Sequence, residues 1–272
     1  MNTLRHCGAL RRALVCFLSS FVLACAVHAQ DKDAVGTGFF VSNAGHIVTA
    51  FHVIRGRSQV LVGPIGPAER RQWRVATVLK TDEVNDLALL QAKLERPPLT
   101  IASWGDVPVG LEALVIGYPQ PFVQGLSKKI TLGIVNGERT ETGEQALFQL
   151  SAEVQRGNSG GPVLSPDGVV IGVVRAKLNA LSLAQKTGDI AQNVNFALKS
   201  SRLIEFLQAA GVPVQVEKPN LVLQPRPYET FRKAEASIIA VVARNPPGTT
   251  AVPADPRGLP AKDLLLPDKP AN

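Results

Sequence analysis

Short apolar segments separated by turn residues fill the chain between residues 35 and 198. Their length of a few residues, and the glycine, proline and asparagine between them, are typical of β-strands joined by tight turns. The segments lie at residues 38–41, 46–50, 59–62, 73–79, 87–90, 112–117, 130–135 and 169–174. This pattern predicts an all-β domain, although the spacing alone does not distinguish a β-sandwich from a β-barrel.

The first 29 residues have the composition of an export signal. A basic start with Arg5, Arg11 and Arg12 precedes an uncharged apolar stretch over residues 13–26, and the small residue Ala29 follows. We therefore expect a secretory signal peptide that is cleaved after Ala29, and a periplasmic or secreted bacterial protein. The apolar stretch is too short to span a membrane comfortably, and no later segment qualifies as a transmembrane helix.

All three cysteines of the chain, Cys7, Cys16 and Cys25, lie within this leader. The mature protein would then contain no disulfide and no cysteine-based metal site. An alternative hypothesis places a lipoprotein cleavage site before Cys25, and a lipid-modified Cys25 would then anchor the protein to a membrane. Soluble export and lipid anchoring both remain open at this point.

The charge of the chain argues against a nucleic-acid partner. The net charge of +7 falls to +4 when the three arginines of the leader are removed. The remaining basic residues are scattered and have no aromatic residues interleaved among them, whereas nucleic-acid binding requires a denser patch. A hydrophobic content of 45% and a charged content of 19% suit a globular enzyme.

A serine surrounded by glycines is the strongest chemical motif. In Gly157-Asn158-Ser159-Gly160-Gly161, the glycines permit a tight turn that presents Ser159 as a nucleophile. The backbone N–H groups of Gly157 and Ser159 would form the oxyanion hole, which stabilises the negative charge of a tetrahedral intermediate. The alternative is an ordinary glycine turn, so the interpretation depends on a general base and its partner elsewhere in the chain.

Candidates for both partners occur upstream of Ser159. His52 follows an apolar segment, and Asp86 precedes another. The chain order histidine, aspartate, serine is that of the chymotrypsin lineage and differs from that of subtilisins and α/β-hydrolases. Asp82 and Glu83 are the alternative acids near this position.

Three segments resemble the catalytic blocks of trypsin-like serine proteases, and most closely those of the disulfide-free bacterial Htr/Deg-type periplasmic proteases. They are Thr49-Ala50-Phe51-His52, Asn85-Asp86-Leu87-Ala88-Leu89-Leu90 and Gly157-Asn158-Ser159-Gly160-Gly161. Residues 36–41, 133–135 and 195–198 resemble further strands of that branch, so the resemblance covers about residues 34–212. It implies two six-stranded antiparallel β-barrels and a serine endopeptidase that acts on polypeptides without a metal or cofactor.

The same resemblance places the site between the barrels. His52 and Asp86 would belong to the first barrel and Ser159 to the second, with the crossover at residues 104–108. Residues 200–210 carry a helical apolar stripe and would form the closing helix of the fold. The same fold with an intact triad could instead act mainly as a binding or chaperone-like module for unfolded envelope proteins, and the sequence leaves this alternative open.

Substrate preference and control are less constrained by the sequence. Glu153 lies six residues before Ser159, where trypsin-like enzymes have the floor of the specificity pocket, and a carboxylate there would favour Lys or Arg in the substrate. Alternatively, Glu153 points to solvent and small aliphatic side chains are preferred, as in Htr/Deg-type relatives. In the digestive trypsin-like proteases the residue before the nucleophile is an aspartate, which pairs with the new N-terminus formed by zymogen cleavage. Here that residue is Asn158, so activation by propeptide removal is not expected. Control of the activity would act through the ordering of two loops, at residues 120–129 and 178–189.

Beyond residue 212 the composition changes. More than half of the 20 prolines fall in residues 213–272, which are too few and too proline-rich for the PDZ domain that usually follows in Htr/Deg-type proteins. We expect the folded unit to end near Gly211 and the last 25 residues to be disordered. Residues 237–243 are nevertheless apolar enough to dock on the folded domain.

Overall fold

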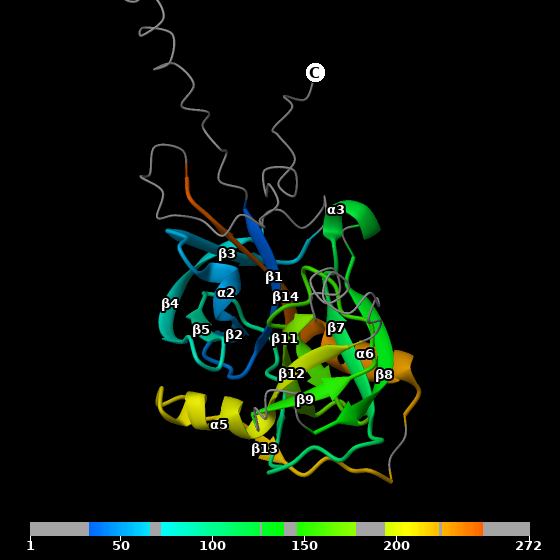
Figure 1. The fold of residues 1–272 in the computed structure, drawn as a ribbon. Coiled ribbons are helices and arrows are strands. Elements are labelled where there is room, and N and C mark those ends of the chain that lie inside the picture. Colours follow the sequence, from blue (N-terminus) through cyan, green and yellow to red (C-terminus); the bar gives the residue numbers. More distant parts are fainter. Residues whose placement is uncertain are drawn as a thin grey trace, which may run out of the picture. The chain divides into compact units, whose positions relative to one another are not determined.

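Most of the residues that the computed structural model describes belong to β-strands. The description covers residues 33–65, 72–125, 127–138, 146–177, 194–222 and 225–246. The signal peptide expected at residues 1–29, the control segment at 178–189 and the tail beyond residue 246 therefore lie outside the described residues. Within the described part, two closed β-barrels form the fold (Figure 1).

The first barrel contains six antiparallel strands in the order β1-β14-β3-β4-β5-β2. These strands are β1 (Ala34–Phe40), β14 (Ile238–Arg244), β3 (Gln59–Gly63), β4 (Arg74–Asp82), β5 (Leu87–Gln91) and β2 (His46–Ala50). A helical turn, α2 (Phe51–Ile54), follows β2 directly and carries His52.

The second barrel contains six antiparallel strands in the order β10-β7-β8-β9-β12-β11, and pairing of β10 with β11 closes it. Its strands are β7 (Glu112–Gly117), β8 (Lys129–Gly137), β9 (Leu147–Leu150), β10 (Pro162–Leu164), β11 (Val170–Lys177) and β12 (Asn195–Lys199). Two short strands, β6 (Ile101–Ala102) and β13 (Val216–Glu217), extend β11 in parallel. The predicted pair of six-stranded antiparallel barrels is confirmed.

Helices are few in the described residues. The expected closing helix is present as α5 (Ser200–Gln208), and it buries Leu203, Phe206 and Leu207. Two further helices are α3 (Pro121–Gln124) and α6 (Pro227–Ala234), the latter followed by the 3-10 turn η2 (Glu235–Ser237).

Apolar side chains fill each barrel and the space between the two. Phe40, Val62 and Val241 pack inside the first barrel, whereas Phe148 and Ile171 pack inside the second. A third cluster contains residues of both barrels together with the apolar face of α5. The facing sides of the two barrels therefore bury apolar surface against each other, and this contact holds the residues on those sides in place.

Strand β14 contradicts the expectation that the folded unit ends near Gly211. It pairs with β1 on one side and with β3 on the other, and so forms part of the closed sheet of the first barrel. Six of its seven residues are buried. Ile239 and Val241 face the barrel interior, while Ala240 and Val242 pack in a separate cluster with Tyr118 and Leu61. The domain boundary expected at residue 212 is therefore wrong.

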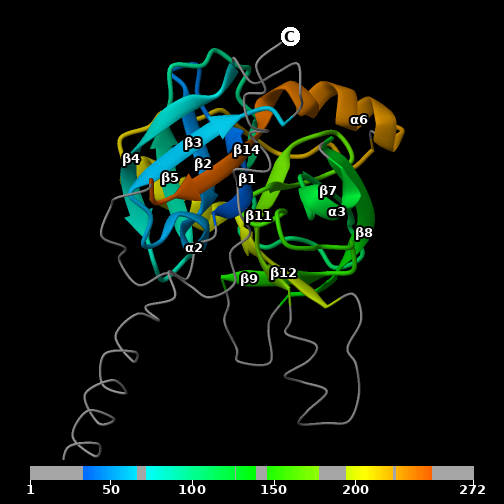
Figure 2. The same cartoon turned by 90° about the horizontal axis from the view of Figure 1, so that it is seen from above.

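The segment before β14 is bound to the second barrel. Helix α6 lies on the turn between β10 and β11, where the Thr230 hydroxyl donates to the carbonyl of Pro166 and Lys233 Nζ donates to that of Asp167, 2.8 Å away. The backbone N–H of Asn220 donates to a carboxylate oxygen of Asp167. Residues 216–222 and 227–234 thus contact the second barrel, and residues 238–244 then enter the first barrel (Figure 2).

The crossover between the barrels also differs from the expected position. Strand β5 ends at Gln91 in the first barrel, and β6 at Ile101 already pairs with β11 of the second. The chain therefore crosses over residues 92–100, earlier than the expected residues 104–108. The later segment is tied to the second barrel, because Lys199 Nζ lies 2.5 Å from Asp106 Oδ1.

Candidate active site

His52 and Asp86 form a tightly bonded pair at one end of the first barrel. His52 Nδ1 lies 2.6 Å from Asp86 Oδ2, and the backbone N–H of His52 donates to Asp86 Oδ1 at 2.8 Å. The backbone N–H of Phe51 donates to the carbonyl of Asp86 at 3.0 Å. An ionised carboxylate can only accept hydrogen bonds, so in a neutral imidazole this pair places the proton on Nδ1 and leaves Nε2 as an acceptor.

The backbone of Asp86 is held in an unfavourable conformation. Its φ of +55° lies in the left-handed region, which few non-glycine residues adopt, aspartate and asparagine more often than most. The turn before it is braced by Asp82, whose carboxylate accepts from the backbone and side chain of Asn85 at 3.0 and 2.6 Å. Burial raises the pKa of Asp82, but these bonds outweigh that effect and the pKa lies below its ordinary value. Of the three acids considered, Asp86 is the one bonded to His52.

Ser159 lies on a turn that packs against the strand leading to His52. Gly160 has φ +81°, and a Cβ at this position would lie 2.3 Å from the backbone nitrogen of Ala50. The carbonyl of Ser159 accepts from the backbone N–H of Thr37 at 2.9 Å. The second barrel therefore presents Ser159 next to α2 of the first barrel, so the structure brings the three predicted residues into one region.

The turn before Ser159 carries the predicted oxyanion-hole donors. Gly157 has φ +99°, and a Cβ would lie 2.1 Å from the carbonyl oxygen of Tyr118, so only glycine fits. Within the described chain, the N–H groups of Gly157 and Ser159 donate to no other group, whereas the neighbouring Asn158 donates to Gln155. Two backbone donors, one on each side of Asn158, are thus available beside the serine.

Glu153, the candidate residue of the specificity pocket, lies on the surface of the protein. Its side chain is exposed and accepts a hydrogen bond from Gln155 Nε2 at 2.5 Å. The preceding Ala152 is fully buried, and its carbonyl accepts from the side-chain amide of Asn195 at 2.8 Å. This placement is the one expected for a surface residue of the 151–155 loop.

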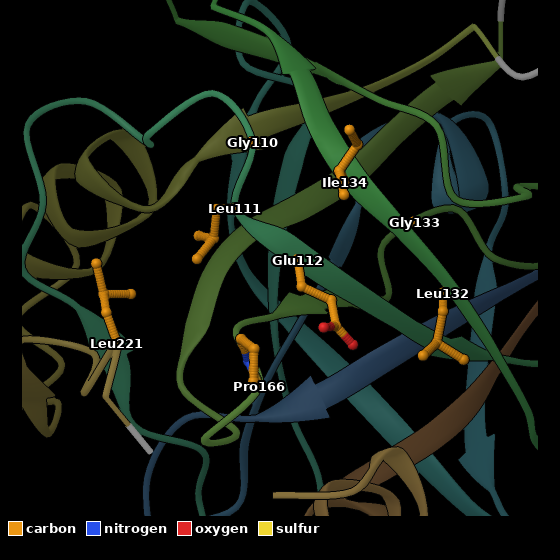
Figure 3. Close-up of a pocket in the computed structure, with 8 residues that line it drawn as sticks. All are labelled: Gly110, Leu111, Glu112, Leu132, Gly133, Ile134, Pro166 and Leu221. Carbon is orange, nitrogen blue, oxygen red and sulfur yellow. The ribbon is translucent and has the colours of Figure 1, made fainter. Parts of the chain in front are cut away.

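A groove elsewhere on the second barrel contains none of the predicted site residues. It has a volume of about 540 Å³ and is lined by β7, β8, the β10–β11 turn and Leu221 (Figure 3). The other histidine of the described chain, His46, lies at the opposite end of β2, where its Nδ1 is 2.6 Å from Ser42 Oγ. Burial lowers the pKa of His46.

Sequence reasoning did not single out Thr37, which lies in the Gly36-Thr37-Gly38 segment of β1. Thr37 is fully buried, and its hydroxyl and backbone contact the turn that carries Ser159. A threonine between two glycines is a weak signal, because nothing in the local pattern shows which residues it contacts far along the chain.

Comparison with known proteins agrees with this geometry. The family model described as "Trypsin-like peptidase domain" matches residues 36–173, which include all three predicted catalytic residues. The chain belongs to the trypsin-like peptidase family. A relative from Chlamydia pneumoniae, named a probable periplasmic serine endoprotease DegP-like, is 34% identical over 253 residues, 87% of this chain and 47% of that protein.

Another relative, the uncharacterised protein y4bJ of Sinorhizobium fredii, is 41% identical over 188 residues, 68% of this chain and 29% of that protein. This trypsin-like peptidase chain therefore spans less than half the length of either relative. The fold matches a solved HtrA-type protease, AlgW with decapeptide, with a TM-score of 0.53 at 24% identity, over 64% of this chain and 51% of the other. In the described part of the chain, no helix is long and apolar enough to cross a membrane.

Proposed function

We propose that this protein is a serine endopeptidase that hydrolyses peptide bonds through an acyl-enzyme, with Ser159, His52 and Asp86 as its catalytic triad. The proposal rests chiefly on one observation, the doubly bonded pair of Asp86 and His52 beside the glycine-rich turn of Ser159. The aspartate of this pair also has a positive φ, and backbone outliers of this kind cluster at functional sites.

In this mechanism Ser159 Oγ attacks the scissile carbonyl carbon while His52 Nε2 accepts the hydroxyl proton. The resulting imidazolium is stabilised by Asp86, which keeps its negative charge throughout. His52 then gives the proton to the leaving amine as the carbon–nitrogen bond breaks. A water molecule, deprotonated by the same histidine, hydrolyses the acyl-enzyme and regenerates Ser159.

The N–H groups of Gly157 and Ser159 form the oxyanion hole in this proposal. Neither N–H donates to another group of the described chain, so both are available to stabilise the developing oxyanion. Asn158 is almost fully buried and neutral, so no ammonium group from a new N-terminus is needed to neutralise it. Activation by propeptide removal is therefore not part of the mechanism.

The expected substrates are polypeptides in the cell envelope. The leader sequence and the periplasmic name of the Chlamydia pneumoniae relative support export to the periplasm or beyond the cell. Unfolded proteins are suitable substrates because an extended backbone must enter the space between the two barrels. A lipid-anchored form starting at Cys25 would act on the same substrates at a membrane surface.

The test is incubation of the purified protein with unfolded casein, with and without prior treatment by phenylmethylsulfonyl fluoride. We expect casein fragments to accumulate only in the untreated sample. Suppression of aggregation of a heat-unfolded protein is measured in parallel. Aggregation suppression without any cleavage would contradict the endopeptidase and favour the chaperone-like alternative.

The position of Glu153 leads to a prediction on specificity. Because its side chain is exposed, Glu153→Ala should change cleavage after Lys or Arg and after Val or Ala by no more than about twofold, since exposed single charges contribute less than about 1 kcal/mol. A peptide library digested by both proteins measures this directly, and we expect small aliphatic residues to dominate before the cut. A selective loss of at least about tenfold after Lys or Arg would instead place Glu153 in the specificity pocket.

A further inference from the structure

We propose that Thr37 is a positioning residue that holds the oxyanion hole in its active conformation through its side-chain hydroxyl. The inference rests on the proposed function, because it assigns a role within the same site. Thr37 lies on β1 of the first barrel, whereas the turn that it contacts belongs to the second barrel.

The direction of the hydrogen bonds of Thr37 is fixed by its partners. The backbone N–H of Tyr118 can only donate, so the Thr37 hydroxyl accepts this bond at 3.1 Å. The single hydroxyl proton is then donated to the carbonyl oxygen of Gly157 at 2.6 Å. Both contacts are buried and shielded from water, which would otherwise compete for the same groups.

Three successive peptide groups define the oxyanion hole, and each is anchored at its carbonyl oxygen. The carbonyl of Arg156 accepts from Gln120 at 2.7 Å, and that of Asn158 accepts from Gly161 at 2.9 Å. In a planar trans peptide the N–H points away from the carbonyl, so these two bonds direct the N–H groups of the following residues, the proposed donors. Thr37 anchors the carbonyl of the middle peptide, and it does so with a side chain.

The middle peptide is bonded at both of its ends, because the N–H of Asn158 also donates to the carbonyl of Gln155 at 3.0 Å. It follows Gly157, which has φ +99° and no Cβ to restrict its rotation. Rotation of this peptide changes the backbone angles on both sides and therefore the convergence of the two donors. The hydroxyl of Thr37 opposes this rotation, since breaking its bond costs the buried carbonyl of Gly157 its acceptor role and leaves the buried hydroxyl proton of Thr37 undonated.

The backbone of Thr37 is in turn held by β2, the strand that leads to His52. Thr49 Oγ1 donates to the carbonyl of Thr37 at 2.8 Å, and the N–H of Thr37 donates to the carbonyl of Ser159 at 2.9 Å. The same residue thus contacts the strand of the general base and the turn of the nucleophile. This arrangement makes the geometry of the oxyanion hole depend on the register of the two barrels.

The test compares Thr37→Val, which removes the hydroxyl at nearly constant volume, with Thr37→Ser, which retains it. The measured quantities are the maximal rate and half-saturating concentration for inactivation by a fluorophosphonate probe, together with casein cleavage. Removing a direct oxyanion-hole donor typically costs about 10²–10³ in rate, and Thr37 acts through Gly157. We expect Thr37→Val to lower the maximal rate about tenfold or more at an unchanged half-saturating concentration, and Thr37→Ser to restore it to within about threefold.

The matched control is Thr230→Val, which removes another buried threonine hydroxyl that donates to a backbone carbonyl, on α6. It should leave the maximal rate within about twofold. If Thr37→Val does not fold, as judged by circular dichroism, the smaller Thr37→Ala is read in its place. A maximal rate equal to that of the unmodified protein, or an equal loss in Thr37→Ser, would overturn the inference. An unmodified protein that neither cleaves casein nor reacts with the probe would contradict the proposed function itself.

Discussion

Replacing Ser159 with Ala is expected to lower casein hydrolysis on the order of 10⁶-fold while the protein stays folded. The oxygen that forms the acyl bond is lost, and the remaining triad members cannot substitute for it because they act as a unit. The serine lies partly exposed at the surface of its turn, so the change to alanine leaves no buried cavity. Initial rates of casein cleavage and a thermal melting curve measure both parts of this prediction.

An exposed serine away from the site provides the matched control. Ser103→Ala removes a hydroxyl on the segment after β6 and should leave the casein rate within about twofold. Replacing His52 with Ala should cost nearly as much as replacing Ser159, because it removes the base that activates the nucleophile. Cleavage by Ser159→Ala at more than about one hundredth of the normal rate would show that another group attacks the substrate.

Removing the C-terminal strand is expected to abolish folding of the first barrel. A chain that ends at Pro213 lacks β14, so β1 and β3 lose their shared partner and the barrel opens. Burial of a Val or Ile side chain contributes about 1.5–3 kcal/mol, and β14 carries two of each that are buried. Their sum is comparable to the whole stability of a typical domain, about 5–15 kcal/mol. We expect aggregation and no reaction with a fluorophosphonate.

Two controls separate the role of the strand from that of chain length. A chain that ends at Pro246 keeps β14 and should fold and react normally. A rearranged chain, with residues 225–246 joined by a short glycine linker in front of Asp33, should also recover activity. Ala243 pairs with Ala34, so the end of β14 lies beside the start of β1 and a short linker can join them. A folded, reactive chain ending at Pro213 would contradict the role assigned to β14.

The proposed catalytic residues were predictable from the sequence because each lies in a local motif. His52 follows an apolar strand, Asp86 precedes one, and Ser159 lies between glycines, and these patterns do not depend on distant parts of the chain. The apolar segments likewise predict strands, and the structure confirms them as two barrels.

The position of β14 could not be predicted in the same way. The prolines around it indicate a loose tail, but the structure places several of them in connections, and Pro227 lies in the first turn of α6. The continuous apolar run of β14 reflects burial on both faces of a strand, which the sequence shows without showing the partner strands. Pairing with β1 joins residues about two hundred positions apart, and no local pattern encodes such a contact.

Thr37 illustrates the same difficulty at the scale of one side chain. Its hydroxyl meets Gly157, which is 120 residues away in the chain. Thr37 also pairs with Ala240 of β14, so a strand whose partners no local pattern encodes supports this residue. The sequence therefore predicts the reacting groups, whereas their support depends on contacts between the two barrels.

The most direct test of the triad is the site of reaction with a fluorophosphonate, determined by peptide mass spectrometry of the labelled protein. The proposed mechanism predicts a single adduct on Ser159 in the unmodified protein, and loss of labelling in His52→Ala and Ser159→Ala, with normal labelling of Ser103→Ala. An adduct on a different residue, or equal labelling of Ser159→Ala and the unmodified protein, would contradict the assignment of Ser159 as the nucleophile.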